Sequence, residues 1–266
     1  MKHYLGLLAT AASLCAAPLS SHAAQAIVGS WYSADSDFHS LTTLLADGRY
    51  FHTTDATGDA AHTGVEWGTW SWNEATGLVT ASAIADQNGD WGLAGDVDGD
   101  VYFHVSGNTG TITQAGNSDV GTTSRVPTLP GSIVGAWFLD SGYSQASVAF
   151  FADGTYFLGV ASLEPGEAGV ERGTYSWDAA TGQLRILGTL TDTSSQSGLA
   201  GQVSQEHGYY LATISGSSLL FREASTQEQD IDVLLPPEAV GAVPEPSSLA
   251  LLLAGAGLVA AARRRN

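Results

Sequence analysis

The acidic residues that could do chemistry in this chain gather in one short stretch. It reads DQNGD and then, after five residues, DVDGD, and it holds five aspartates: Asp86, Asp90, Asp96, Asp98 and Asp100. Ca²⁺ takes about six to eight oxygen ligands, which such side chains supply. The glycines are out of register with an EF-hand loop and no glutamate follows at the required spacing, so solvated turns are the alternative interpretation. We keep the five aspartates as candidate Ca²⁺ ligands and expect no resident metal or cofactor.

Residues for covalent or acid–base catalysis form no recognisable constellation. The sequence has no Gly-x-Ser-x-Gly elbow, no His-x-x-x-His pair and no lysine after Lys2. Glu66 and Glu171 occupy equivalent places in two similar segments, whereas a paired-carboxylate glycosidase needs both acids in one cleft. We expect these glutamates to be exposed structural residues. The protein is predicted not to be an enzyme, with a secreted hydrolase as the third-ranked alternative.

Two tryptophans, Trp67 and Trp91, are candidates for ligand binding. Exposed indole rings stack on sugar rings, and nearby carboxylates accept hydrogen bonds from sugar hydroxyls. In a second, similar half of the chain these positions hold Arg172 and Ser197. A carbohydrate- or small-ligand-binding β-barrel is therefore the alternative to a purely structural role. The competing interpretation of Trp91 is that it covers one end of a barrel.

The body of the chain is a duplication, and its repeated segments are the elements that must position these residues. Each of four segments returns about a hundred residues later. They are IVGSWY and IVGAWF (from Ile27 and Ile133), ADGRYF and ADGTYF (from Ala46 and Ala152), GVEWGTWSWNEATG and GVERGTYSWDAATG (from Gly64 and Gly169), and GLAG (from Gly92 and Gly198). Units of this length are whole domains rather than solenoid repeats.

Each copy is predicted to be all-β. Asp-Gly and Thr-Gly pairs between apolar runs indicate tight hairpins, and a third hairpin is expected near Gly107 and Gly216. About six to eight short strands per copy point to a small antiparallel barrel or sandwich. We expect copy one at 27–116 and copy two at 132–223. Residues 117–131 and 224–242 are expected to be linkers, the second of them acidic.

Alternation along the strand from Val65 to Trp72 separates an inner from an outer face. Trp70 and Trp72, with Glu66, share one face, and Trp67 lies on the other. Because a position that holds Trp67 in one copy and Arg172 in the other is a poor core position, we expect both residues to point outward. Core positions are expected at the aromatic residues that both copies keep: Trp31 and Trp137, Tyr50 and Tyr156.

The net charge limits which partners the protein can bind, and the N-terminal segment indicates the compartment to which it goes. Lys and Arg number 9 against 27 Asp and Glu, a net charge of −18, which excludes nucleic acid as a partner. Residues 1–23 resemble a secretory signal peptide: Lys2, an apolar run and the site Ser21-His22-Ala23, with cleavage after Ala23 or Ala26 equally compatible. The single cysteine, Cys15, lies inside this segment, so the mature protein is expected to have no thiol.

Residues 243–266 combine three features in order. Val243-Pro244-Glu245-Pro246 is followed by an uncharged apolar run and then by Arg263, Arg264 and Arg265. The run is short against the ~20 residues of a typical transmembrane helix, but snorkelling arginines extend its reach. We predict a transmembrane segment here, with the arginines on the cytoplasmic side.

This tail closely resembles the PEP-CTERM sorting signal of Gram-negative bacteria. The resemblance implies an exosortase as processing partner, an inner-membrane anchor before processing, and then a cell-surface or extracellular location, often linked to exopolysaccharide or biofilm. It implies nothing about the body, whose Gly-x-Trp segments (Gly29, Gly135) loosely resemble the first strand of lipocalin-like barrels. We therefore predict an exported, non-catalytic surface or matrix protein, with exopolysaccharide as a candidate partner.

Overall fold

The computed structural model describes residues 26–89, 91–94, 99–141, 144–162, 168–194, 197–201, 208–224 and 231–241. Within these ranges the chain is all-β, as predicted, and no helix there is long and apolar enough to cross a bilayer. Both copies belong to one compact unit, Ala24–Val243. The expected signal peptide and transmembrane segment lie outside the described residues.

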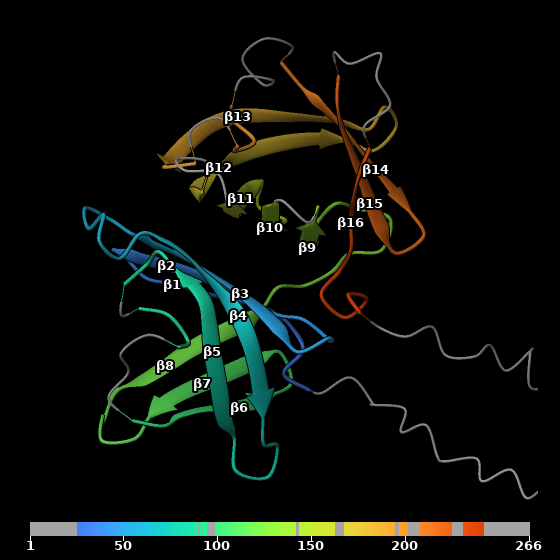
Figure 1. The fold of residues 1–266 in the computed structure, drawn as a ribbon. Helices are drawn as coiled ribbons and strands as arrows, with labels where there is room; N and C mark the ends of the chain where they lie inside the picture. The colour runs from blue at the N-terminus through green and yellow to red at the C-terminus, as the bar shows by residue number, and fades with distance from the viewer. Residues whose placement is uncertain are drawn as a thin grey trace, which may run out of the picture. The chain divides into compact units, whose positions relative to one another are not determined.

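Copy one is a closed eight-stranded antiparallel barrel (Figure 1, blue to green). Its strands follow one another around the barrel in chain order. They are β1 (Gly29–Ala34), β2 (Phe38–Leu44), β3 (Arg49–Ala56), β4 (Gly64–Trp72), β5 (Leu78–Asp86), β6 (Val101–Ser106), β7 (Thr109–Gln114) and β8 (Val120–Arg125). The barrel closes where β1 pairs with β8, Trp31 opposite Arg125 and Tyr32 opposite Ser124.

Copy two repeats the same strand order in a second eight-stranded sheet. Its strands are β9 (Gly135–Asp140), β10 (Ser144–Phe150), β11 (Thr155–Ser162), β12 (Gly169–Asp178), β13 (Gln183–Asp192), β14 (Tyr210–Ser215), β15 (Ser218–Glu223) and β16 (Asp232–Leu234). Its edges meet at a single bridge, where Phe138 and Leu235 exchange backbone hydrogen bonds of 2.8 and 3.0 Å. The seam of copy two is therefore shorter than that of copy one.

The last strand of each copy lies in a stretch for which the sequence predicts a linker. Strand β8 falls within 117–131 and β16 within 224–242. Most residues of both strands are exposed, so neither carries a clear apolar alternation. Each is needed because a sheet closes only when its last strand reaches its first.

The three pairs of predicted hairpins are confirmed. Gly48 and Gly154, between the second and third strands of each copy, have φ of +87° and +85°. Glycine adopts this left-handed conformation without the clash that a Cβ would introduce. The turns at Gly77 and Gly182, and those near Gly107 and Gly216, have the same character.

The repeated aromatic residues fill the inside of each barrel. Trp31 and Trp137 are 1% and 3% exposed, and each indole nitrogen donates to the carbonyl of the residue four positions earlier, Ile27 (2.8 Å) or Ile133 (2.7 Å). This contact explains why the isoleucine and tryptophan of IVGxW recur together. Trp70 and Tyr175 also point inward, as the alternation predicts.

The outer faces of the two sheets pack against each other within the compact unit. Apolar side chains of both copies form one buried cluster that includes Leu41, Phe51, Phe138 and Phe157. Polar contacts also join the copies, among them the hydroxyls of Thr43 and Ser147 at 2.7 Å. Arg172 Nε donates to Asp55 Oδ2 at 2.8 Å, and this aspartate also accepts a hydrogen bond from Thr191.

Candidate functional site

A buried glutamate holds a loop inside copy one. Glu66 Oε1 accepts hydrogen bonds from the hydroxyl of Tyr50 (2.5 Å) and from the backbone N–H groups of Leu93 (2.9 Å) and Ala94 (3.1 Å). Its side chain is fully buried, and this burial raises the pKa of the carboxyl group. The glutamate therefore fixes the GLAG loop to the barrel wall.

Copy two repeats this arrangement. Glu171 accepts hydrogen bonds from the hydroxyl of Tyr156 and from the N–H of Ala200 (3.0 Å), and burial raises its carboxyl pKa as well. The Glu66 and Glu171 carboxylates approach Gly92 and Gly198 so closely that an added Cβ would overlap them. The tyrosine, the glutamate and the GLAG segment recur because they form one structural contact.

The expectation of exposed glutamates is therefore wrong. Both side chains are 0% exposed, since they lie on the inward face of the fourth strand of each copy. The alternation already placed Glu66 on the face of Trp70. Oε1 of Glu66 accepts three hydrogen bonds, whereas the buried Oε2 has no hydrogen-bond partner among the described residues.

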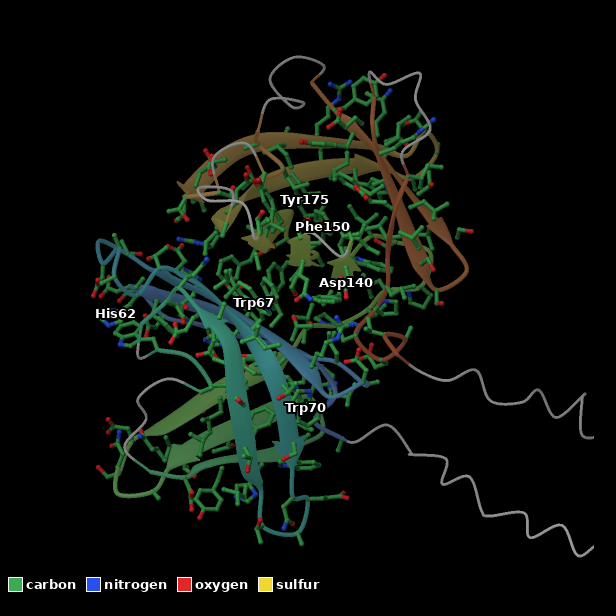
Figure 2. All side chains as sticks on the ribbon, in the orientation of Figure 1. His62, Trp67, Trp70, Asp140, Phe150 and Tyr175 are labelled. Carbon is green, nitrogen blue, oxygen red and sulfur yellow. The ribbon has the colours of Figure 1, made fainter. Side chains whose placement is uncertain are left out.

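Trp67 points away from the inside of its barrel, as predicted, but it is not a free surface residue. It is half-buried and packs against the apolar cluster that joins the two copies; Figure 2 labels it on the ribbon of β4. The equivalent Arg172 binds Asp55 of copy one. Both positions therefore serve contact between the copies.

Trp91 lies against the end of copy one at which β2 begins. Its ring stacks on His62, with ring centroids 4.4 Å apart, and meets Phe38 edge-on at 5.3 Å. His62 is in turn held by Asp59, at 2.7 Å. The backbone carbonyl of Trp91 lies 3.1 Å from Nε2 of the buried His52. The residue remains 42% exposed, so it covers the barrel while keeping part of its indole in contact with solvent.

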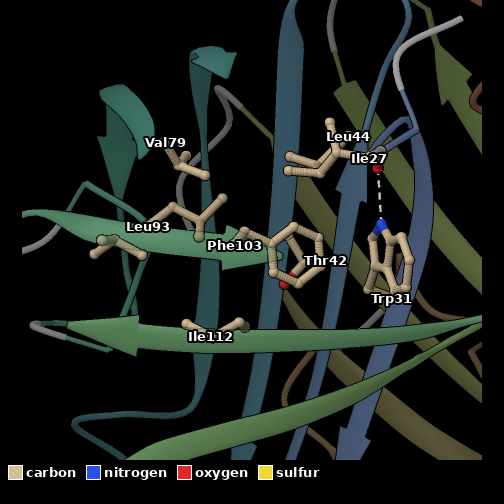
Figure 3. A pocket seen from close by; sticks show the side chains of 9 residues that line it. Ile27, Trp31, Thr42, Leu44, Val79, Leu93, Phe103 and Ile112 are labelled. Carbon is tan, nitrogen blue, oxygen red and sulfur yellow. Dashed lines mark hydrogen bonds between the residues drawn. The ribbon is translucent and has the colours of Figure 1, made fainter. Parts of the chain in front are cut away.

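Below Trp91 the inside of copy one holds a buried polar network beside its apolar core. His52 Nδ1 lies 2.8 Å from the hydroxyl of Thr42, and Asn88 donates to the hydroxyl of Thr54 at 2.6 Å. Burial lowers the pKa of His52 to about 4, so the imidazole is neutral at pH 7. The cavity described in this barrel, lined by Ile27, Trp31 and Phe103 among others, measures about 20 Å³. Figure 3 shows the residues that line this cavity, including Trp31, whose indole nitrogen donates a hydrogen bond to the carbonyl of Ile27.

Copy two encloses a larger cavity, which both apolar and polar side chains line. Its cavity measures about 460 Å³, within the roughly 300–1,000 Å³ usual for small-molecule sites. The apolar part of the lining includes Val148, Phe150, Leu158, Val160, Leu199 and Phe221. At its edge lie three serines and three charged residues, namely Ser144, Ser162, Ser197, Arg222, Glu223 and Asp232.

Matching the repeated segments shows how the two interiors diverged. Copy one has a buried polar network at the positions where copy two has aliphatic side chains. Thr42, His52 and Thr54 correspond to Val148, Leu158 and Val160. The aromatic pair over copy one is also absent from copy two, where Phe38 and Trp91 correspond to Ser144 and Ser197. From copy one to copy two, the first three substitutions remove polar side chains and the last two remove aromatic rings.

The candidate calcium ligands are only partly described. Asp86 ends β5, and its Oδ1 accepts a hydrogen bond from the N–H of Asn88 at 3.1 Å. Asp100 is exposed, whereas Asp90, Asp96 and Asp98 lie outside the described residues. Within the described part of the chain, no three His, Cys, Asp or Glu residues lie close enough to hold a metal ion.

Comparison with curated proteins finds no match. Among solved structures, the chain aligns with DNA polymerase III β subunits from Thermotoga maritima (9% identity, 82% of this chain, TM-score 0.12) and Pseudomonas aeruginosa (8%, 85%, 0.13). It spans only 60% and 62% of those chains. TM-scores this low support no conclusion about fold or function.

The decisive comparison concerns the segment with the Pro-Glu-Pro sequence and the three arginines. Pro244, Glu245, Pro246, Arg263, Arg264 and Arg265 lie outside the described residues, so their assignment depends on sequence. A family model for the PEP-CTERM protein-sorting motif matches residues 242–266. This match confirms the resemblance on which export and exosortase processing depend. Residues 242–266 are a PEP-CTERM protein-sorting motif, the signal of an exported protein that an exosortase sorts.

Proposed function

We propose that this protein is a non-catalytic component of the cell surface or extracellular matrix, associated with exopolysaccharide in a biofilm. The sorting motif at residues 242–266 is the observation that supports this proposal most directly. In the proposed sequence of events, the motif anchors the chain in the inner membrane. The exosortase then removes the tail, and residues 24–243 remain at the surface or are released.

The compact unit suits a structural role. Two barrels that share a buried apolar cluster and a buried ion pair present one stiff body to the surroundings. The net charge of −18 keeps such a body soluble. The glutamate that both copies carry holds a loop by hydrogen bonds in each, and this structural use supports a role without catalysis.

Intact-mass measurement of the protein recovered from the surface or medium of its host tests the sorting step. We expect a mass that lacks Arg263–Arg265. Replacing Pro244, Glu245 and Pro246 together by alanine should leave the tail in place and the protein in the membrane fraction. Pro127→Ala/Pro130→Ala, in the segment between the copies, is the matched control and should be processed normally. A released wild-type protein with its tail intact would contradict the proposal.

A pull-down with the exopolysaccharide of the host tests the matrix association. The exposed part of Trp91 is the sugar-stacking surface that copy one offers. We expect retention of the wild type and weaker retention of Trp91→Ala. Equal retention of both would show that Trp91 does not contribute to polysaccharide binding. No retention of either would contradict the exopolysaccharide association.

A further inference from the structure

We propose that copy two binds an apolar small molecule with an uncharged, hydroxyl-bearing head group inside its barrel. The site is the cavity of about 460 Å³, and its walls come from strands β9–β11 and β14–β16 and the segment Ser197–Leu199. This proposal goes beyond the surface role and does not depend on the sorting motif, because every residue of the site lies within Ala24–Val243.

The apolar character of the cavity comes from strands that could have filled it with polar groups. In copy one the same strands carry His52, Thr42 and Thr54, which hydrogen-bond to one another or to the loop above them. In copy two the aliphatic residues Val148 and Leu158 replace two of them. An apolar cavity holds water poorly and gains free energy when it accepts apolar surface, about 25 cal/mol for each Å² buried.

Access to the cavity follows from the loss of the aromatic cover. Over copy one, Trp91 stacks on His62 and meets Phe38, and its carbonyl lies within hydrogen-bond distance of His52 inside the barrel. In copy two, the corresponding Ser197 and Ser144 are themselves part of the cavity lining. Copy two thus has the inner surface of a binding site and small side chains where copy one is covered.

The charged and hydroxyl-bearing side chains at the edge of the cavity determine which head group the ligand can carry. Arg222 is accompanied there by Glu223 and Asp232, so two acids stand beside one cation. The whole chain is also acidic. A carboxylate or phosphate head would therefore meet net repulsion, whereas the hydroxyl of Ser144, which also contacts Ser141 Oγ at 3.1 Å, can both donate to and accept from an alcohol.

The test uses Nile red, an uncharged dye whose emission shifts to the blue in apolar surroundings, with the chain as isolated from its host. We expect saturable binding to the wild type. Ser144→Phe/Ser197→Trp transfers the aromatic cover of copy one to copy two and should weaken binding at least tenfold. Val160→Phe narrows the cavity from within and should weaken binding to the same extent. It replaces the double variant as the test if a thermal melt shows that the double variant does not fold.

Leu187→Ser/Leu190→Ser is the matched control, because these leucines of β13, at 64% and 65% exposed, are the most exposed large apolar side chains of copy two among the described residues. It should bind as the wild type does. Dye bound at the tail is common to all four proteins and does not affect their comparison. Absence of binding to the wild type, or equal binding by folded covered and narrowed variants, would overturn the proposal.

Competition against bound Nile red then tests the head group. Dodecan-1-ol should displace the dye at concentrations at least tenfold lower than dodecanoate, which has the same chain length and a negative charge. Equal or better displacement by dodecanoate would overturn the assignment of an uncharged head. Failure of tail processing in the host would leave all of these results unchanged, so the two proposals can fail separately.

Discussion

The two barrels share a framework and differ in what they enclose. Both hold a loop with a buried glutamate and tyrosine, and both fold the tryptophan of IVGxW back onto the preceding isoleucine. Copy one contains a buried polar network and a described cavity of about 20 Å³, whereas copy two has aliphatic side chains at the equivalent positions and a cavity of about 460 Å³. The residues kept in both copies are therefore those that position backbone, and the residues that vary determine the contents of the barrel.

A second difference lies on the outer faces, where the copies meet. Copy one contributes Trp67 and Asp55, and copy two contributes Arg172, which binds that aspartate. Copy two has Ala161 at the position of Asp55, and copy one has Trp67 at the position of Arg172. Each copy therefore contributes one partner of the buried ion pair.

Loss of the buried ion pair between the copies should have the largest effect. Arg172→Met leaves Asp55, whose side chain is 3% exposed, without its charged partner. We expect a loss of about 3–5 kcal/mol in the free energy of unfolding, measured by denaturant titration. Arg49→Met breaks the more exposed pairs with Asp47 and Asp140 and should cost about 1 kcal/mol or less. Equal losses would show that the Arg172 pair is not desolvated.

The neutral histidine of copy one should make that copy sensitive to acid. Burial lowers the pKa of His52 from 6.5 to about 4, so between these values the unfolded chain binds a proton that the folded chain does not. The stability contribution is complete above pH 6.5 and is lost as the pH falls to about 4.

The expected size of this effect is on the order of 3 kcal/mol. His52→Leu, which introduces the residue of copy two, should reduce the pH dependence of the unfolding free energy by that amount between pH 7.5 and pH 4. Parallel curves for the wild type and the variant would contradict a buried neutral imidazole.

The shared loop contact should respond equally in both copies. Gly92→Ala and Gly198→Ala each place a methyl group on a glutamate oxygen, and overpacking of this kind costs about 1–3 kcal/mol. Gly121→Ala and Gly188→Ala are matched controls, since the nearest atoms to their new methyl groups lie at 3.7 and 3.8 Å. These controls should change stability by no more than about 0.5 kcal/mol in thermal melts. A loss in only one copy would show that the framework is not shared.

Removal of the aromatic cover from copy one should have the smallest effect. Trp91→Ser introduces the residue of copy two and loses ring contacts with His62 and Phe38, worth about 1 kcal/mol. It should create no Nile red site, because the barrel beneath has a cavity of only about 20 Å³. New dye binding in this variant would mean that the cover alone distinguishes the two interiors.

Local sequence patterns were sufficient for the parts of the fold that depend on neighbouring residues. Asp-Gly and Thr-Gly pairs predicted the hairpins because only a few residues tolerate the left-handed turn conformation. Alternation separated Trp70 from Trp67 because side chains of a strand point to opposite faces. The order of Pro-Glu-Pro, apolar run and arginines indicated the sorting motif directly, without any folded structure.

The predictions that were wrong or incomplete depended on which residues pack against the inner or outer face of a strand. Trp67 was assigned to the outside of its barrel, which is correct, but the outside is covered by the other copy. Glu66 is predicted to be exposed because each copy carries one such acid at the start of a strand rather than two in one cleft. Its partners, Tyr50 and the N–H groups of Leu93 and Ala94, are distant in sequence and meet it only when the barrel forms.

The sequence by itself determined the duplication, the β-structure, the inner and outer faces and the sorting motif, because each depends on residue order or on local backbone preference. Only the tertiary structure decided that β8 and β16 complete the sheets, that the copies share a buried interface and that copy two is hollow. These features depend on which side chains from many strands meet in space, and the volume they leave unfilled is a property of the whole barrel rather than of any segment.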